Sequence, residues 1–567
     1  MRIYFCFLCN FILSVAHAQV DNTVNVVRDF EPTIKQSYKT IESANLPDSN
    51  AQKKIKVTYN YLDTKASLQG FEPMSSTLAD IKVQNNANYN SPLYIRLGAS
   101  SLKRPFAEIH GNLFTSSSLL LYTQLEYQAA EFDNPDPTLF TKAKNTQLGA
   151  TIGLKKTFYS NELKANVGYQ KANFSYFDVI PDLGEINIDN IQSIYSKIHA
   201  EVSLGSIDAT NIKQKEGLHY TAKVNAYQLK DQTFGPQERH ISVSGKVQFN
   251  LASFYTTLEA SVDNYNANIP ATPYVPATNT NLPNTIFQQT VFHFLPSIAI
   301  QKNGIHAKAG IAIWSNIGTM NQFYAFPVID ATYKINNNLL LKAKLDADYQ
   351  LNSMDKLRQE NPMLGFITQY TNTITPYRLK VGVEAKSNAI NYGVNVCYQR
   401  LSGTYFYLHN WSSLGNRLFT SQDTTSLLQP TIYFNYDKKN IQLTAQATYF
   451  AFGKLRRHAQ AYEVPTLQAT LQGKVFFTEK LYTEISLKIL ANQYTTNIDS
   501  VGSYKAIKAK SAVLLDAELG YHFQSNIGVF VKGHNLLNAS YSRYLYYGQP
   551  KTYVTLGVWY TLKPKKI

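Results

Sequence analysis

Lys551–Leu562 reads Lys-Thr-Tyr-Val-Thr-Leu-Gly-Val-Trp-Tyr-Thr-Leu. Because successive side chains of a β-strand point to opposite faces, this stretch has one mixed face and one apolar face, which carries Val554, Leu556, Val558, Tyr560 and Leu562. An apolar, aromatic-ended strand near the C-terminus is typical of the strand that closes an outer-membrane β-barrel. We therefore expect Gly557, Tyr560 and Leu562 to belong to the strand that the barrel-assembly machinery recognises. The alternative is an edge strand of a soluble sheet.

Alternation of apolar and polar residues continues upstream from this strand. It predicts 22 strands that begin near residues 93, 105, 118, 145, 161, 193, 218, 238, 252, 288, 304, 322, 339, 376, 390, 428, 440, 464, 481, 512, 526 and 552. In a soluble sandwich the apolar face would pack on a second sheet. Here one pattern persists without a second kind of element, which favours an all-β fold: one transmembrane antiparallel barrel over residues 92–567.

Two predicted strands show the polar face of this barrel clearly. Apolar residues alternate with charged ones after Leu341 and again after Tyr377. If the apolar side faces lipid, the charged side faces the lumen. The expected lumen-facing charges are Lys342, Lys344, Asp346, Asp348, Arg378, Lys380, Glu384 and Lys386. The cations outnumber the carboxylates in this set, so we expect such a wall to attract anions.

The predicted connections alternate between tight turns and long loops. Tight turns include 302–304 and 336–338, whereas the long loops are 131–144, 264–287, 353–375, 411–427 and 495–511. Short periplasmic turns and long outer loops are the barrel pattern. An even number of strands then places both the N-terminus and the C-terminus of the mature protein in the periplasm. The segment 207–217 is an exception, since it is long for an inner turn.

Composition and charge exclude other classes. The chain has 567 residues, 54 Lys and Arg against 39 Asp and Glu, and a net charge of +15. The basic residues are dispersed along strands rather than clustered, which argues against nucleic acid as a partner. Only 16% of residues are charged, whereas 13% are aromatic. Because the mean hydropathy is also slightly negative, at −0.26, a helical membrane protein is excluded and a barrel is favoured.

Residues 1–18 have the pattern of a secretory signal peptide. Arg2 precedes an apolar run, and Ala16-His17-Ala18 is a small-x-small cleavage site. Cys6 and Cys9 leave with the signal, so the mature chain keeps only Cys397. A single cysteine forms no internal disulfide, and the sequence suggests no metal site and no cofactor. We expect the outer membrane of a Gram-negative bacterium, and its lipid, to surround the mature protein.

The tail of the chain resembles a known family. Gly533-His534-Asn535-Leu536-Leu537-Asn538, the aromatic loop 541–547 and the final strand resemble the last two strands of TonB-dependent receptors. Phe294-Leu295-Pro296-Ser297-Ile298 and Leu428-Gln429-Pro430-Thr431-Ile432 resemble the proline-initiated strands of the same family. This resemblance implies an outer-membrane receptor or transport barrel that takes up a substrate. The alternatives are a structural outer-membrane subunit of an envelope complex, with a partner filling the lumen, and a passive porin.

Residues 19–91 depart from the family pattern. They are polar and weakly patterned, which predicts a periplasmic arm. A plug domain of the TonB-dependent receptor kind needs about twice this length, and its Gly-rich signature is missing. The segment with Thr23, Val24, Val26 and Val27 resembles a TonB box, which pairs as a strand with the energy-coupling partner. The resemblance of 26–32 to arms of plug-poor relatives points to Bacteroidota. The possible partners are TonB and a periplasmic or lipoprotein subunit.

No motif in the sequence indicates an enzyme. It contains no Gly-x-Ser-x-Gly elbow, no phosphate loop and no spaced set of His and Cys ligands. Asp346 and Asp348 lie beside lysines on one strand face, so we interpret them as solvated lumen charges rather than an acid–base pair. A barrel of this size needs an obstruction. We expect the arm, the loops 264–287 and 353–375, or a separate partner to supply it.

Overall fold

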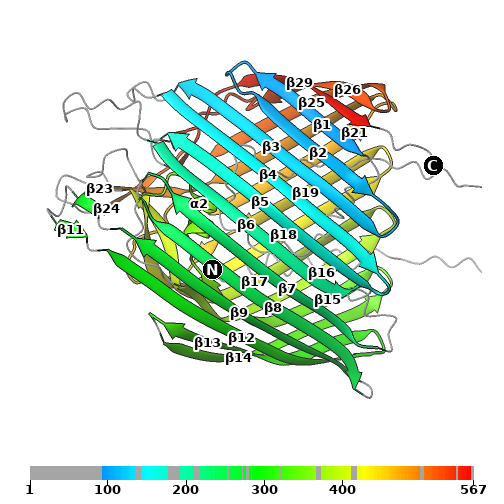
Figure 1. Ribbon diagram of the computed structural model, residues 1–567, viewed down its shortest axis with the longest axis vertical. Helices are drawn as coiled ribbons and strands as arrows, with labels where there is room; N and C mark the ends of the chain where they lie inside the picture. The colour runs from blue at the N-terminus through cyan, green and yellow to red at the C-terminus, as the bar shows by residue number, and fades with distance from the viewer. Residues whose placement is uncertain are drawn as a thin grey trace, which may run out of the picture. The chain divides into compact units, whose positions relative to one another are not determined.

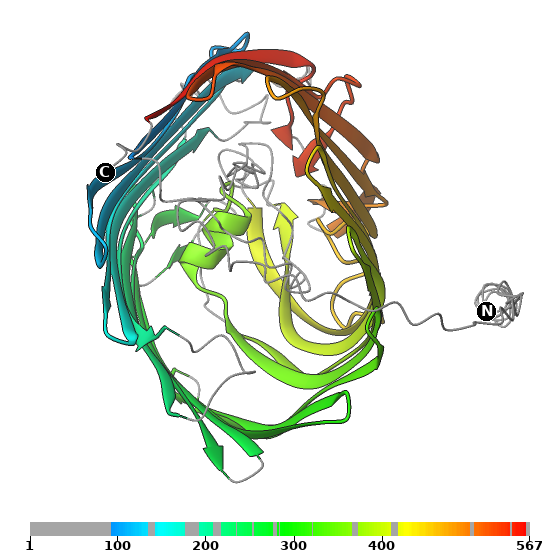
Figure 2. The ribbon, with the colours of Figure 1, turned by 90° about the vertical axis from the view of Figure 1, so that its right-hand side faces the viewer.

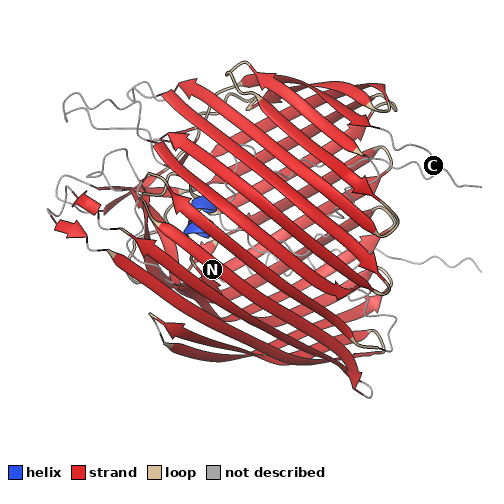
Figure 3. Cartoon of the chain, in the orientation of Figure 1, coloured by secondary structure: helices blue, strands red, loops and turns tan. Residues whose placement is uncertain are grey.

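Alternating apolar and polar residues form long antiparallel strands throughout the described part of the chain. The computed structural model describes residues 92–133, 142–175, 192–207, 217–233, 235–251, 254–270, 272–275, 280–282, 284–319, 321–365, 372–409, 418–498, 504–544 and 547–562. Strands dominate these residues, with one short helix (Figure 3). No helix among them is long and apolar enough to cross a membrane. The signal peptide and the arm predicted at residues 1–91 lie outside the described residues.

The strands form one antiparallel sheet that closes on itself (Figure 1). Its first half consists of β1 (Leu93–Ser100), β2 (Phe106–Thr115), β3 (Leu119–Asp133), β4 (Lys142–Phe158), β5 (Asn161–Ser175), β6 (Gln192–Ser206), β7 (His219–Asp231), β8 (Gln237–Leu251), β9 (Phe254–Ile269), β12 (Thr285–Lys302) and β13 (Ile305–Gly318). Its second half consists of β14 (Gln322–Asn336), β15 (Leu339–Leu351), β16 (Asn372–Ser387), β17 (Ile390–His409), β18 (Leu418–Lys438), β19 (Ile441–Tyr449), β20 (Ala451–Phe452), β21 (Leu467–Phe476), β22 (Leu481–Ala491), β25 (Ala512–Gln524), β26 (Ile527–His534) and β29 (Tyr553–Leu562).

Three small hairpins and a helix lie in the connections between strands at the end of the barrel that has the long loops. The hairpins are β10–β11 (Thr272–Val275 and Thr280–Leu282), β23–β24 (Tyr494–Ile498 and Tyr504–Lys508) and β27–β28 (Ser542–Tyr544 and Tyr547–Gly548). The helix is α2 (Met354–Glu360), in the connection between β15 and β16. We call the opposite end of the barrel, where β1 begins and β29 ends, the short-turn end.

The last strand closes the barrel, as its sequence predicts. β29 pairs with β26 on one side and with β1 on the other, where Tyr560 lies opposite Ile95. β19 and β20 are successive parts of a single strand, because both pair with β18. The break between them is Phe450, whose N–H donates to the carbonyl of Thr466. The 23 strand segments therefore make 22 barrel strands, which confirms the predicted fold class.

The predicted strand starts lie within four residues of the observed ones, with one exception. β18 begins at Leu418 rather than near 428, so the loop predicted at 411–427 is wrong over its second part. Residues 418–427 pair with β17 instead. Pro296 and Pro430, both predicted to stand near the start of a strand, lie within β12 and β18 instead, opposite Leu258 and Val396. The loop predicted at 264–287 is also shorter, since β9 ends at Ile269 and β12 begins at Thr285.

The outer face of the barrel is apolar and bounded by tyrosines. On β29, Leu556 is 63% exposed, whereas Thr555 is 5% and Trp559 is 9% exposed. On the outer face of β17, Tyr392 and Tyr398 bracket a run of exposed valines. Aromatic residues mark both edges of the lipid-facing band in such barrels. The part of β17 that follows Tyr398 therefore lies beyond this band, at the end with the long loops, and we call it and residues 418–427 of β18 the outer parts of these strands.

Aromatic rings on the lumen wall lie across glycines of the neighbouring strand. The ring of Phe530 covers Gly557, its partner in the register, and Tyr433 covers Gly393 in the same way. Similar pairs are Phe106 with Gly98, Tyr122 with Gly153, Tyr482 with Gly520 and Trp559 with Gly528. Such aromatic cover compensates for the packing that a glycine lacks in a strand.

Gly557→Ala is expected to destabilise the barrel where it closes. The new Cβ would overlap the Phe530 ring and lie 2.6 Å from the carbonyl oxygen of Leu97. Overpacking of this kind costs about 1–3 kcal/mol. The measurement is the urea midpoint followed by the heat-modifiable band on a gel. Gly149→Ala is the matched control, because its Cβ would meet only the Cβ of Glu126 at 3.9 Å. Equal midpoints for the two variants would contradict the prediction.

Candidate functional site

The short helix α2 is built by local sequence and held by the barrel wall. Ser353 caps its first turn, with the Ser353 hydroxyl accepting the Lys356 N–H at 3.1 Å. Glu238 of β8 accepts the N–H groups of Met354 at 2.6 Å and Asp355 at 3.2 Å. These N–H groups have no partner within a helix, and an anion at a helix N-terminus is favourable. The cap therefore fixes α2 against β8.

The segment that contains α2 reaches a distant part of the wall. We call residues 352–365 the strap. The strap leaves the sheet between β15 and β16 but contacts β6, β7 and β8. Along the sheet, these three strands are separated from β15 by β9 and β12–β14. Viewed along the barrel, α2 lies inside the ring of strands (Figure 2). The strap thus crosses the lumen on the side of the long loops.

A buried ion pair locks the strap to β7. Arg358 and Asp231 are each 1% exposed, and the Arg358 guanidinium donates to the Asp231 carboxylate. Arg358 also donates to the hydroxyl of Ser193 at 2.9 Å and to the carbonyl of Leu364. A second pair joins Lys197 of β6 to Asp355 at 2.6 Å. A buried charge needs such a set of partners, because an unpaired one is strongly unfavourable.

Apolar side chains of the strap complete the docking. Met354, Leu357 and Leu364 are at most 2% exposed. They belong to one cluster with the wall residues Leu229, Ala267, Ile269 and Phe287 and with Tyr405, Tyr407, Leu418, Tyr544 and Tyr547 from other outer segments. The strap therefore has a packed core of its own against the wall, in addition to its ion pairs.

The outer parts of β17 and β18 are buried on both faces. Tyr407 donates from its hydroxyl to the Glu360 carboxylate of α2 at 3.0 Å, and Tyr405 donates to the same carboxylate. On the other face, Phe406 and Leu408 pack in one cluster with Tyr462, Phe452 and Tyr494. This strand pair therefore lies between α2 and the segments 451–466 and 494–498. Because both faces of these strands contact protein, their sequences do not alternate between apolar and polar residues. The strand prediction therefore missed residues 418–427.

Polar contacts connect the remaining outer segments. Glu463 accepts from Gln493 at 2.7 Å and from the hydroxyl of Thr495. Tyr544 donates from its hydroxyl to the Glu360 carbonyl at 3.0 Å. Asp423 accepts the N–H groups of three consecutive residues, 456–458, at 2.9–3.0 Å. We call the strap, the outer parts of β17 and β18, loop 453–466, β23–β24 and β27–β28 the loop assembly.

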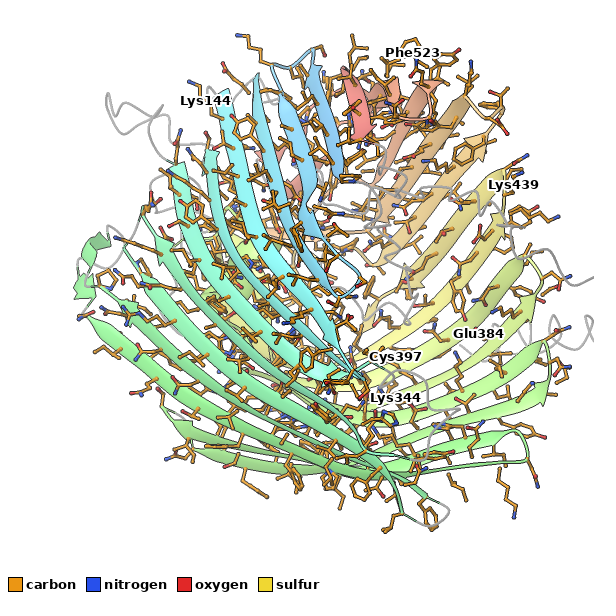
Figure 4. All side chains as sticks on the ribbon, turned by 45° about the vertical axis from the view of Figure 1, so that its right-hand side comes forward. Lys144, Lys344, Glu384, Cys397, Lys439 and Phe523 are labelled. Carbon is orange, nitrogen blue, oxygen red and sulfur yellow. The ribbon has the colours of Figure 1, made fainter. Side chains whose placement is uncertain are left out.

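The structure pairs most of the charges that the sequence assigned to the lumen. Asp346 accepts from Arg378 at 2.7 Å and contacts Lys344 at 2.9 Å, while Lys342 contacts Glu384 across β15 and β16. Asp348 lies 3.6 Å from Arg378. Lys380 lies opposite Cys397, and Lys386 is near the turn after β16. Figure 4 labels Lys344, Glu384 and Cys397 on the three neighbouring strands. The predicted attraction of anions stays a prediction.

The other predicted site residues have different outcomes. Gly557, Tyr560 and Leu562 lie on β29, and their part in assembly stays a prediction. Thr23, Val24, Val26 and Val27 lie outside the described residues. Among the residues that the structure describes, no group of three or more His, Cys, Asp and Glu side chains is placed to hold a metal ion. The carboxylates Asp231 and Glu238, and Arg358 on the strap, were missing from the sequence prediction.

Docking of the strap is expected to strengthen as pH rises. Burial lowers the pKa of Lys356 to about 8, against an ordinary value near 10.4. The docked strap therefore binds fewer protons than the released strap. Raising the pH from roughly 8 to roughly 10 consequently makes the free energy of docking more favourable. Lys356→Met should remove this dependence and tighten docking at pH 7. The measurement is thermolysin cleavage within 352–365, normalised at each pH to a free peptide of that sequence. A pH dependence that survives in the variant would contradict the assignment.

Comparisons with known proteins identify the fold. No protein-family model matches the sequence, and no curated protein matches it. The chain is similar to the structure of the ferric-catecholate import receptor Fiu from E. coli K12, with TM-score 0.60 and 10% identity over 83% of this chain and 82% of that chain. It is also similar to the siderophore receptor PirA from Acinetobacter baumannii, with TM-score 0.61 and 10% identity over 83% and 80%. The copper transporter OprC matches with TM-score 0.58 and 8% identity over 83% and 80%. The fold is that of TonB-dependent receptors, as the resemblance of the tail predicted.

Proposed function

We propose that this chain is a non-enzymatic outer-membrane receptor barrel that takes up a substrate across the outer membrane. The observation that carries the proposal is the loop assembly, in which the strap crosses the lumen and is locked by Arg358 and Asp231. The structural neighbours include an import receptor, a siderophore receptor and a copper transporter, which supports the class of function. A passive porin needs an open water-filled lumen, which a strap with a packed core disfavours.

In this proposal the short-turn end faces the periplasm. β1 begins and β29 ends at that end, next to tight turns such as the one between β12 and β13. Short turns are periplasmic in outer-membrane barrels. Under this proposal both termini are periplasmic, and the segment with Val24 and Val26 pairs with TonB. A structural subunit of an envelope complex is the second candidate, since residues 19–91 are short for a plug and a partner would then fill the lumen.

Depletion of compounds from the medium tests the proposal. Cells with and without the protein are incubated in a complex medium, and mass spectrometry follows the loss of each component. We expect at least one component to be lost only from cells that have the protein and a proton gradient. Val24→Pro should abolish this loss without changing the amount of barrel in the outer membrane, because proline cannot donate in a strand pairing. Identical media with and without the protein would favour the structural subunit.

A further inference from the structure

Four neighbouring strands line part of the lumen with uncharged polar side chains. They are the inward-facing positions of 391–395 on β17, 431–435 on β18, 444–448 on β19 and 468–472 on β21. The register aligns them in rows across the strands. The middle row is Gly393, Tyr433, Gln446 and Thr470. The rows on either side contain only asparagine, glutamine and threonine. We call this set the neutral array.

The neutral array contrasts with those sectors of the lumen wall in which lysines and carboxylates pair across neighbouring strands. Examples are Lys155 with Glu162, Lys223 with Glu201, and Lys246 with Glu259. The array is bordered by two such pairs, Lys342 with Glu384 and Lys474 with Glu484. Within it no side chain carries a charge at neutral pH, and the nearest carboxylate, Glu384, is already paired with Lys342 and hydrogen-bonded to Tyr433.

Among the residues that the structure describes, most side chains of the array have no hydrogen-bond partner. The described contacts within it are between the hydroxyls of Thr431 and Thr448 at 3.2 Å and from the Gln446 amide to Thr448 at 3.3 Å. The side chains of Asn435 and Gln472 make no such contact and are half-buried, so the lumen reaches them. An amide offers two donors and an acceptor, and a hydroxyl offers both functions. The array therefore presents unused donors and acceptors to the lumen.

An aromatic ring lies flat at the centre of the array. A Cβ on Gly393 would meet the Tyr433 ring at 2.7 Å, so the ring lies over this glycine and against the wall. The Tyr433 side chain is half-buried, and its hydroxyl is hydrogen-bonded to the Glu384 carboxylate. Lys439, at the turn after β18, marks the short-turn rim beyond this sector, and Cys397 lies further along β17 (Figure 4). The Tyr433 ring is thus a flat apolar surface surrounded by the amide and hydroxyl side chains of the array.

We propose that the neutral array binds an uncharged, hydroxyl-rich ligand, a linear oligosaccharide, on its way through the barrel. Amides and hydroxyls match the donors and acceptors of sugar hydroxyls, and the Tyr433 ring matches the apolar face of a sugar ring. A polypeptide would need pockets for its side chains, which a flat row of short polar groups does not provide. The proposal rests on the uptake function and names the chemistry of its substrate.

Binding to the purified full-length protein tests the proposal. The probes are maltohexaose, cellohexaose and xylohexaose, with hexaglycine blocked by an N-terminal acetyl group and a C-terminal amide as an uncharged peptide and citrate as an anion, each followed by calorimetry. We expect at least one hexasaccharide to bind. The double variant Gln446→Leu with Gln472→Leu should weaken that binding about tenfold, because two hydrogen-bonding groups are lost. Gln170→Leu is the matched control, since Gln170 lies on the inner face of β5 outside the array, and should leave binding unchanged. Heat-modifiable mobility verifies that each variant is folded.

The outcomes separate this proposal from the uptake function. Binding of citrate or hexaglycine alone, binding of no probe, or a double variant with unchanged affinity for the sugar would overturn the array as a sugar site. A hexasaccharide that binds the purified barrel but stays in the medium of energised cells would contradict uptake and support the array. Depletion of charged compounds alone from the medium would support uptake and overturn the array.

Discussion

Asp231→Ala is expected to release the strap from the wall at a cost of about 3–5 kcal/mol. The Arg358 guanidinium is buried and donates to Asp231, so the variant leaves a buried charge without its carboxylate. A penalty of this size lowers the protection of the α2 amides by about two to four orders of magnitude. Hydrogen exchange of residues 354–361, followed by mass spectrometry, measures it. Trypsin should also cleave after Lys356 and Arg358 in the variant.

Two further variants make this test specific. Glu384→Ala removes the carboxylate of a pair in which Lys342 is 50% exposed, and exposed pairs contribute only about 0–1 kcal/mol. It should leave exchange of α2 unchanged. The double variant Asp231→Leu with Arg358→Met replaces the buried pair by apolar residues and should recover most of the protection, because such replacements are often neutral. If Asp231→Ala and Glu384→Ala behave alike, the ion pair does not hold the strap.

The sequence predicted the parts of this barrel in which one face of a strand meets lipid. On β16, Leu379 and Val381 are exposed while Arg378 and Lys380 point inward, so lipid and water impose a period of two. The outer parts of β17 and β18 have protein on both sides, and Tyr405, Phe406 and Tyr407 are all buried. No alternation is left there to detect. The same physical rule therefore explains both the success of the fold prediction and its failure at 418–427.

The contacts of the candidate site could not be predicted from the sequence, for a different reason. Arg358 and Asp231 are 127 residues apart, and nothing local to either one selects its partner. The sequence did predict a long outer loop at 353–375 and made this loop a candidate obstruction. It did not identify the docking partners, because the curvature of the sheet, and not any pattern within a strand, brings β6–β8 near this loop. Ser353 followed by Asp355 was the available signal for a capped helix.

Replacing residues 353–371 with a short Gly-Ser linker is expected to open the barrel to ions. The strap then loses its ion pairs, its packed core and its path across the lumen, whereas the strands on either side keep their pairing through β15 and β16. Conductance of the purified protein in planar bilayers measures the effect. A 22-stranded barrel is wide enough for a large pore when its lumen is clear. The intact protein should be closed under the same conditions, and Asp231→Ala should open intermittently.

A deletion of residues 21–90 shows whether the strap acts alone. If the N-terminal segment also obstructs the lumen, neither deletion will open a large pore and the combination will. If the strap is sufficient, its replacement will open the pore whether or not 21–90 are present.

The charges on β15 and β16 predict the selectivity of any such pore, since the cations from Lys342 to Lys386 outnumber the carboxylates among them. Anion preference should weaken as salt rises, because screening acts over about 8 Å at physiological salt. Cation preference in every open variant would show that the paired carboxylates, rather than the excess lysines, set the potential of the lumen.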